Sequence, residues 1–182
     1  MKQFFGMSQS GNLQEAVKGL HNPQFIMLLS NNDQFEAHVK KLEELYPQIP
    51  SIGCIGMSYD TRVVEKGVGI VAFYDGVTVT ANVLEEVSVM PVKYINRLER
   101  DVHTINGSMD DTICIDFCCG NDACVLTTIH SVLKHRNISL VGGTGDGGKV
   151  SANGKIYSDA VAYGLVKNNH GRVKAYKENI YR

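Results

Sequence analysis

The sequence is short of the features that would place it in a specialised class of protein. It has no tryptophan and only four prolines, and charged residues make up 20% of its 182 positions with a formal net charge of −1. This balance offers no broad basic field, so we do not expect nucleic acid as a partner. No apolar run approaches the roughly 20 residues of a membrane helix, and the first residues lack the apolar core of a signal peptide. We therefore expect no membrane segment.

The cysteine content points to a reducing compartment. There are five cysteines, an odd number, and four of them lie between residues 114 and 124. A secreted disulfide framework has an even number at wider spacings, so this pattern favours a cytoplasmic protein. A hydrophobic content of 43% is that of an ordinary globular chain with a real core.

Periodicity predicts an alternation of strands and helices. Leu13, Val17 and Leu20 have helical spacing, so we expect one amphipathic helix in an N-terminal segment, residues 1–22, ahead of a single domain over 22–182. In that domain we expect strands at 25–29, 67–74, 77–84, 112–118, 138–141, 155–157, 159–166 and 172–176, and helices at 34–45, 91–103 and 123–135. Asp75-Gly76 predicts a two-residue hairpin between 67–74 and 77–84.

The two halves of the chain align without gaps at an offset of 142 − 53 = 89. The offset places Ile26 on Ile115 and Gly53 on Gly142. Any two strand–helix–strand units look alike, which is the alternative to a true repeat. The fold class we predict is α/β, an α+β sandwich: a mixed sheet with helices packed on it, made of two pseudo-repeated β-α-β-hairpin units.

A glycine-rich stretch, Asn137–Gly148, begins with the apolar run at 138–141 and continues with five glycines. A dinucleotide or phosphate fingerprint needs a helix directly after the glycines, whereas residues 149–155 are polar and turn-like. The stretch is therefore either a tight structural crossing or a cradle for a small ligand. A quieter copy, Ile49–Asp60, occurs in the first half.

We predict a ligand site where these two stretches meet. In the second stretch the candidates are Gly142, Gly143, Thr144 and Asp146, and in the first they are Gly53, Cys54, Ser58, Asp60 and Arg62, with Asn121 beside them. A carboxylate suits an amino group, and the guanidinium of Arg62 suits the carboxylate end of a zwitterion. No complete catalytic set is readable, so we expect neither an enzyme nor a cofactor or metal.

Two alternatives use the cysteines. Cys54 would be the nucleophile of a small hydrolase or transferase if folding brought a histidine to it. Cys114, Cys118, Cys119 and Cys124 would form a metal or redox sensor, although their spacing also fits buried small apolar residues.

Four segments together resemble a known family. They are Ile52–Ser58, Gly67–Val71, Leu140–Asp146 and Asp159–Tyr163, and the chain is similar to the N-terminal half of the FIST domain over about residues 22–178. The resemblance implies a sensory input module of bacterial signalling proteins, including chemoreceptors and two-component kinases, that binds small molecules such as amino acids. It implies a downstream signalling domain outside this chain and supplies no catalytic residues. A homodimer is left open by the sequence.

Overall fold

The computed structural model describes residues 1–56, 58–59, 62–63, 66–120 and 122–176, and its strands form two main sheets. The larger sheet has the order β1 (Lys2–Ser8), β6 (Val68–Tyr74), β2 (Phe25–Ser30), β3 (Ser51–Ile55), β10 (Asp146–Ala152) and β11 (Lys155–Tyr157). The smaller has the order β7 (Val77–Glu85), β12 (Ala160–Asn168), β8 (Thr112–Cys119) and β9 (Ser139–Thr144). A separate pair joins β4 (Ser58–Tyr59) to β5 (Arg62–Val63).

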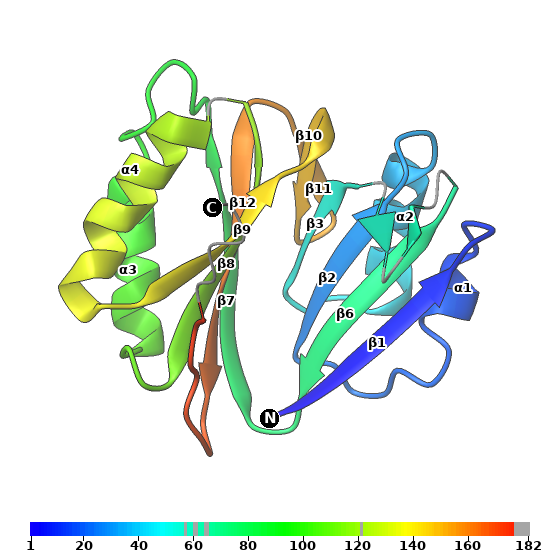
Figure 1. Cartoon of the computed structure of the whole chain (residues 1–182), viewed down its shortest axis with the longest axis horizontal. Coiled ribbons are helices and arrows are strands. Elements are labelled where there is room, and N and C mark those ends of the chain that lie inside the picture. The colour runs from blue at the N-terminus through cyan, green and yellow to red at the C-terminus, as the bar shows by residue number, and fades with distance from the viewer. Residues whose placement is uncertain (57, 60–61, 64–65, 121, 177–182) are drawn as a thin grey trace, which may run out of the picture.

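Helices cover the outer face of each sheet (Figure 1). The larger sheet carries α1 (Leu13–Ala16) and α2 (Phe35–Leu45), and the smaller carries α3 (Ile95–Ile105) and α4 (Asp122–Leu133), which a 3₁₀ turn, Lys134–Arg136, extends. The inner faces of the two sheets pack on each other through an apolar core that includes Phe25, Ile52, Ile115, Val150 and Ala162. The fold is thus a four-layer α-β-β-α sandwich, and it confirms the predicted class with two mixed sheets in place of one.

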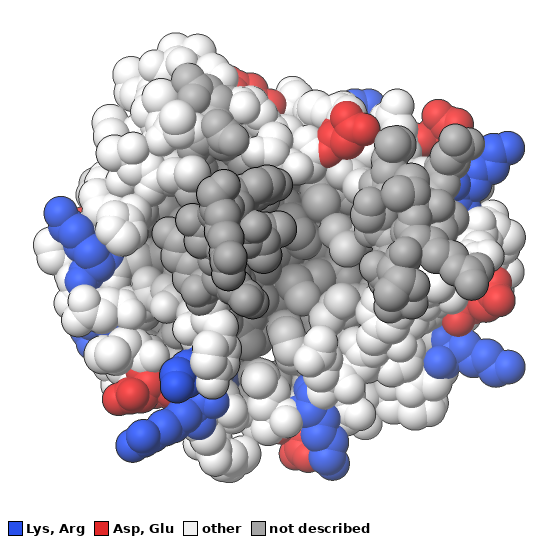
Figure 2. Space-filling view, in the orientation of Figure 1, with Lys and Arg blue, Asp and Glu red and all other residues white. Residues whose placement is uncertain are grey.

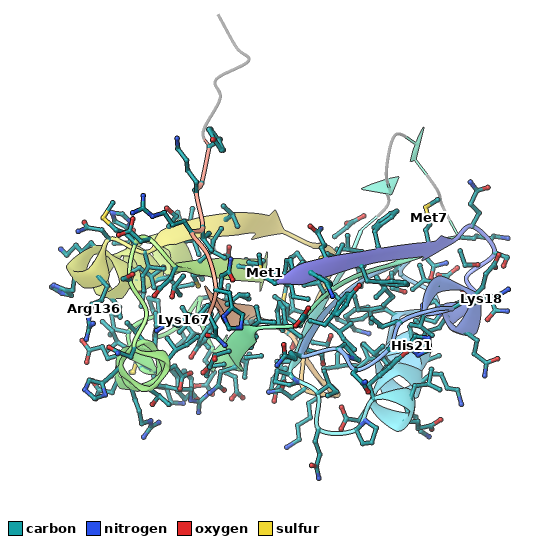
Figure 3. All side chains as sticks on the ribbon, turned by 90° about the horizontal axis from the view of Figure 1, so that it is seen from below. Met1, Met7, Lys18, His21, Arg136 and Lys167 are labelled. Carbon is teal, nitrogen blue, oxygen red and sulfur yellow. The ribbon has the colours of Figure 1, made fainter. Side chains whose placement is uncertain are left out.

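Figure 3 shows the same layers end-on, with Lys18 and His21 at one side and Arg136 at the other. Each outer layer has its own apolar cluster, separate from the core between the sheets. On α2, the apolar residues Phe35, Val39 and Leu42 are buried against the sheet. In the turn before this helix, the Asn31 side chain accepts a hydrogen bond from the Gln34 backbone N–H at 3.1 Å.

The two halves have the same topology. The first runs β1-α1-β2-α2-β3 and then β6, the second runs β7-α3-β8-α4-β9 and then β12, and their strand orders β1-β6-β2-β3 and β7-β12-β8-β9 match. Each half contains one parallel pair, β2 with β3 and β8 with β9. The repeat inferred from the sequence therefore holds at the level of the fold.

The constant offset of 89 holds between β3 and β9, but between β2 and β8 the structure gives an offset of 88. Leu28 pairs with Gly53 in the first half and Asp116 pairs with Gly142 in the second, so the equivalent strand positions differ by 116 − 28 = 88. Ile26 faces the outer helices, whereas Ile115, its partner at an offset of 89, faces the other sheet. A slip of one residue turns every side chain of a strand to the opposite face, so the pairing register decides which residues correspond.

The predicted hairpin at Asp75-Gly76 is also wrong. Both residues have the positive φ of a tight turn, 61° and 87°, but β6 and β7 belong to different sheets. The turn joins the two layers instead of two paired strands. Each of the two strands pairs within its own sheet. β6 lies between β1 and β2, and β7 pairs with β12 over nine residues.

Other boundaries differ from expectation. Within residues 1–22, the helix is only Leu13–Ala16, and Lys2–Ser8 forms β1, which pairs along its full length with β6. Within residues 149–155 the predicted turn is confined to 153–154, because 149–152 belong to β10 and Lys155 begins β11. The strand expected at 172–176 is absent from that described segment, and the helix expected to begin at residue 91 begins at Ile95.

Candidate functional site

The glycine-rich stretch passes from one sheet to the other. It leaves the smaller sheet at the end of β9, and after Gly145 it enters the larger sheet as β10. A side chain at Gly145 would begin 2.8 Å from the Cβ of Cys54, so the two layers approach too closely there for any other residue. The stretch is thus a structural crossing, one of the two roles that its composition predicts.

The same stretch also forms one wall of a small cavity. The cavity has a volume of about 200 Å³ and lies where α4 covers the carboxyl-terminal parts of the parallel strands β8 and β9. Its lining comprises Asp116 and Cys118 from β8, Val125 and Leu126 from α4, and Leu140, Gly142, Gly143 and Thr144 from β9. The carboxyl end of parallel strands is the usual place for ligands in α/β sheets.

Asp116 is the charged group in this lining. It is 3% exposed, and among the described residues no side chain donates a hydrogen bond to its carboxylate. Burial raises the pKa of Asp116 to about 6, and a contact with its own backbone N–H opposes this only in part. The carboxylate is therefore held at a position where ionisation is costly unless a cation joins it.

Gly142 makes room for that carboxylate. A Cβ at this position would lie 2.0 Å from the backbone oxygen of Asp116 and 2.1 Å from its Oδ1. Any side chain at residue 142 would therefore displace either the strand pairing or the carboxylate. The glycine is required by a close approach and not by its backbone angles.

The equivalent position in the first half contains no polar group. Leu28, which pairs with Gly53 as Asp116 pairs with Gly142, is 1% exposed and packs among the apolar side chains beneath α1 and α2. A Cβ at Gly53 would lie 3.0 Å from the Leu28 backbone oxygen. Both halves keep the close strand approach, but only one places a carboxylate there. This asymmetry argues that Asp116 serves a purpose other than packing.

The neighbours of Asp116 on the sheet do not neutralise it. Cys114 and Cys118 flank it on the same face of β8, and Tyr163 is its partner on β12. The Tyr163 hydroxyl donates instead to Oδ2 of Asp101 on α3, at 2.6 Å. The hydroxyl group of this strand partner is thus bonded to a different carboxylate.

The predicted site residues fall into three groups. Gly142, Gly143 and Thr144 line the cavity with Asp116. Asp146 does not, because it is exposed at the start of β10 and accepts a hydrogen bond from the Gly147 backbone N–H at 2.8 Å.

Gly53 and Cys54 belong to β3, and they are buried away from the cavity lining. Ser58 and Arg62 lie on β4 and β5. Asp60 and Asn121 fall outside the described residues.

The cysteine alternatives find little support. Cys54 is 5% exposed, and burial raises the pKa of its thiol to about 12, which leaves almost no thiolate near neutral pH. Cys114, Cys118 and Cys119 are also buried, and burial raises the pKa of Cys114 and Cys119. Within the described part of the chain, no three side chains of metal-binding type come together.

Asp116 is the residue that sequence reasoning missed. In the sequence, Asp116 is the single carboxylate of the strand Thr112–Cys119, whose other residues are mostly apolar or cysteine. A lone carboxylate in such a strand indicates a buried charge. The glycines that begin in β9 are the stronger signal in the sequence because five of them occur within residues 142–148. The charged partner lay on the adjacent strand, 26 residues earlier in the chain (142 − 116 = 26).

Charged side chains outside the cavity are of mixed sign. Figure 2 shows lysines and arginines interspersed with acidic residues around the rim of the face that it presents. This distribution agrees with the net charge of −1, and the described residues on that face give no field of a single sign. Among the described residues, no helix is both long and apolar enough to cross a membrane.

The fold is thus a four-layer α-β-β-α sandwich with a small cavity at the carboxyl ends of one parallel strand pair. Comparison with known families agrees with this class: the FIST N domain family matches residues 24–181, and the chain belongs to that family. FIST domains are sensory domains of signal-transduction proteins, not a family of catalysts. No curated protein matches the chain.

Proposed function

We propose that the chain is the cytoplasmic input domain of a bacterial signalling protein such as a chemoreceptor, and that it binds a small metabolite in the cavity beside Asp116. The observation that carries this proposal is a buried carboxylate without a side-chain partner among the described residues, facing a cavity at the carboxyl ends of β8 and β9. Amino acids and related amino compounds are the first ligands to test. Membership of a sensory family makes a downstream signalling partner part of the proposal.

The size of the cavity limits the ligand. A volume of about 200 Å³ falls below the roughly 300–1,000 Å³ typical of sites for drug-sized molecules. A nucleotide or a large cofactor would not fit without movement of α4. A metabolite with only a few non-hydrogen atoms would fill the space.

Of the residues chosen from the sequence, Gly142, Gly143 and Thr144 keep their place in the proposed site. Asp116 replaces Asp146 as the anchoring carboxylate. Roles for Ser58, Asp60, Arg62 and Asn121 stay predictions, as does a homodimer. A thiol-dependent hydrolase is disfavoured by the burial and the raised pKa of Cys54.

A thermal-shift screen with a variant that blocks the cavity tests the proposal. A ligand at about 100 times its Kd adds roughly 2.7 kcal/mol to the free energy of unfolding, which raises Tm by roughly 5–11 °C for a chain of this size. Leu126 is 49% exposed at the cavity, so Leu126→Trp should obstruct the site without disturbing the core. Leu45, 37% exposed on the matching helix α2, provides the control Leu45→Trp.

We expect a ligand from the screen to stabilise the wild type and Leu45→Trp equally, and Leu126→Trp much less. A ligand that stabilises all three proteins alike would place the binding site elsewhere. No stabilisation by any amino acid, amine or small carboxylate would remove the support for a small-ligand sensor.

A further inference from the structure

We propose that the cavity binds the protonated amino group of a small amine with an apolar body, in preference to a zwitterionic amino acid. This inference rests on the proposed function, because it assigns ligand chemistry to the same cavity. It depends on three properties of the described lining, namely its charge, its hydrogen-bonding groups and its apolar surface.

The described lining carries negative charge only. Asp116 supplies the single carboxylate, and no lysine, arginine or histidine occurs among the described lining residues. A cationic ligand would find its counter-ion in Asp116. The carboxylate of an amino acid would enter the same small space as Asp116 and would meet no cation there, which is repulsive at low dielectric. The lining therefore discriminates between an amine and the corresponding amino acid.

The hydrogen-bonding groups point to an ammonium donor. Asp116 accepts from no side chain of the described residues, and the Tyr163 hydroxyl on the adjacent strand is bonded to Asp101. The thiols of Cys114 and Cys118 are the other titratable groups beside Asp116 on β8, and neither β9 nor α4 adds a titratable side chain to the described lining. An ammonium group can donate three hydrogen bonds, and charge-assisted bonds to a carboxylate are the stronger kind.

The rest of the lining suits a short hydrocarbon. Val125 and Leu126 from α4 and Leu140 from β9 line the cavity, and the glycines of β9 add no polar side chain. Apolar surface on the ligand would be removed from water against these groups. Leu126 and the end of β9 are exposed, so the ligand can enter from this side. A small primary amine with a short alkyl chain satisfies both parts of the cavity.

Three matched probes test the ligand class by isothermal titration calorimetry. They are n-propylamine, its neutral counterpart 1-propanol, and 2-aminobutyric acid, which is n-propylamine with a carboxylate added. Ionic strength is matched with sodium chloride, and the pH is set above the pKa of about 6 of Asp116. We expect n-propylamine to bind at least tenfold more tightly than either of the other probes, because a charged hydrogen bond is worth about tenfold or more.

Two aspartate variants separate this cavity from general charge effects. Asp116→Asn keeps the shape of the side chain and should weaken n-propylamine binding by about 10- to 100-fold. Asp146→Asn, in the exposed part of the same glycine-rich stretch, should leave binding unchanged. In the wild type, affinity should fall about tenfold per pH unit below pH 6, since protonation removes the counter-ion. Asp116→Asn should lose this pH dependence.

The results that would refute the amine assignment differ from those that would refute the proposed sensory function. Equal or tighter binding of 2-aminobutyric acid, or n-propylamine binding that Asp116→Asn does not weaken, would refute the amine assignment while a small-ligand sensor stands. Equal binding of 1-propanol would mean that the cavity selects only for apolar bulk, which also refutes it. If neither the three probes nor the wider screen gave any binding to the wild type, both the amine assignment and the proposed function would fail.

Discussion

Replacing Asp116 with asparagine should stabilise the ligand-free protein at neutral pH, although it removes a buried residue. The pKa of Asp116 is raised in the folded state from 3.8 to about 6, because burial penalises the ionised form. Between these two values the folded state binds more protons than the unfolded state, so the stability falls as the pH rises. Asparagine has no charge to bury, so Asp116→Asn escapes this loss.

The magnitude follows from the pKa values. The difference of about 2 units, at 1.36 kcal/mol per unit, corresponds to about 3 kcal/mol. This penalty is absent below a pH of about 4, where both states are protonated, and is complete above pH 6 to 7. For a chain of this length, about 3 kcal/mol is worth roughly 6–12 °C in Tm. The effect is therefore large enough to measure by differential scanning calorimetry.

The assay compares the wild type with Asp116→Asn from about pH 4 to about pH 8, the window over which the proton linkage acts. We expect equal Tm values at the acid end and a higher Tm for Asp116→Asn at the alkaline end. Asp146→Asn, which is exposed, is the control and should track the wild type throughout. A Tm difference that does not change with pH, or an asparagine variant that is less stable at pH 8, would show that the ionised carboxylate is paired in the folded protein and would refute the reasoning.

Three further predictions follow from close contacts and burial. Gly142→Ala should lower the free energy of unfolding by about 1–3 kcal/mol in urea titrations, because its methyl group would lie 2.0 Å from a backbone oxygen of β8. The control Gly143→Ala has open space around the added methyl group, so its free energy of unfolding should stay within about 0.5 kcal/mol of the wild type. Cys54 should resist iodoacetamide in the native protein and react on unfolding, as followed by mass spectrometry; rapid native alkylation would contradict its burial and its raised pKa. Tyr163→Phe should cost about 1–3 kcal/mol in the same titrations, since Asp101 would lose its 2.6 Å hydrogen bond, and an unchanged midpoint would show that this bond adds nothing to stability.

Local patterns in the sequence were enough to predict most elements of the fold. The apolar run of β2 and the amphipathic pattern of α2 gave their positions to within a residue, because each is decided by burial of side chains close together in the chain. The partner of each strand was harder to predict. Asp75-Gly76 has the composition and the backbone angles of a hairpin turn, yet the two strands that it joins belong to opposite layers. Partner choice depends on contacts far apart in sequence, which turn residues do not encode.

Of the cavity lining, the sequence pointed to the glycines and not to Asp116, for a similar reason. The glycines of β9 are conspicuous, and Gly142 and Gly143 do line the cavity. The sequence predicts Asp146, which is near in the chain, as the carboxylate beside them, but Asp146 accepts a hydrogen bond from the adjacent Gly147 backbone N–H. Asp116 reaches the cavity because β8 and β9 are parallel neighbours, and a parallel pair brings together residues separated by a whole helix.

The placement of β10 and β11 in the larger sheet has a consequence for how the chain folds. These strands follow β9 of the second half, but they extend the sheet of the first half, where β10 pairs with β3. Asn153, at the turn between them, accepts from the Ser51 N–H at 3.1 Å and donates to the Ala81 carbonyl at 3.0 Å. A fragment that ended before β8 would leave β3 as a bare sheet edge, so the two halves, though alike in topology, can no longer be separated into independent folding units.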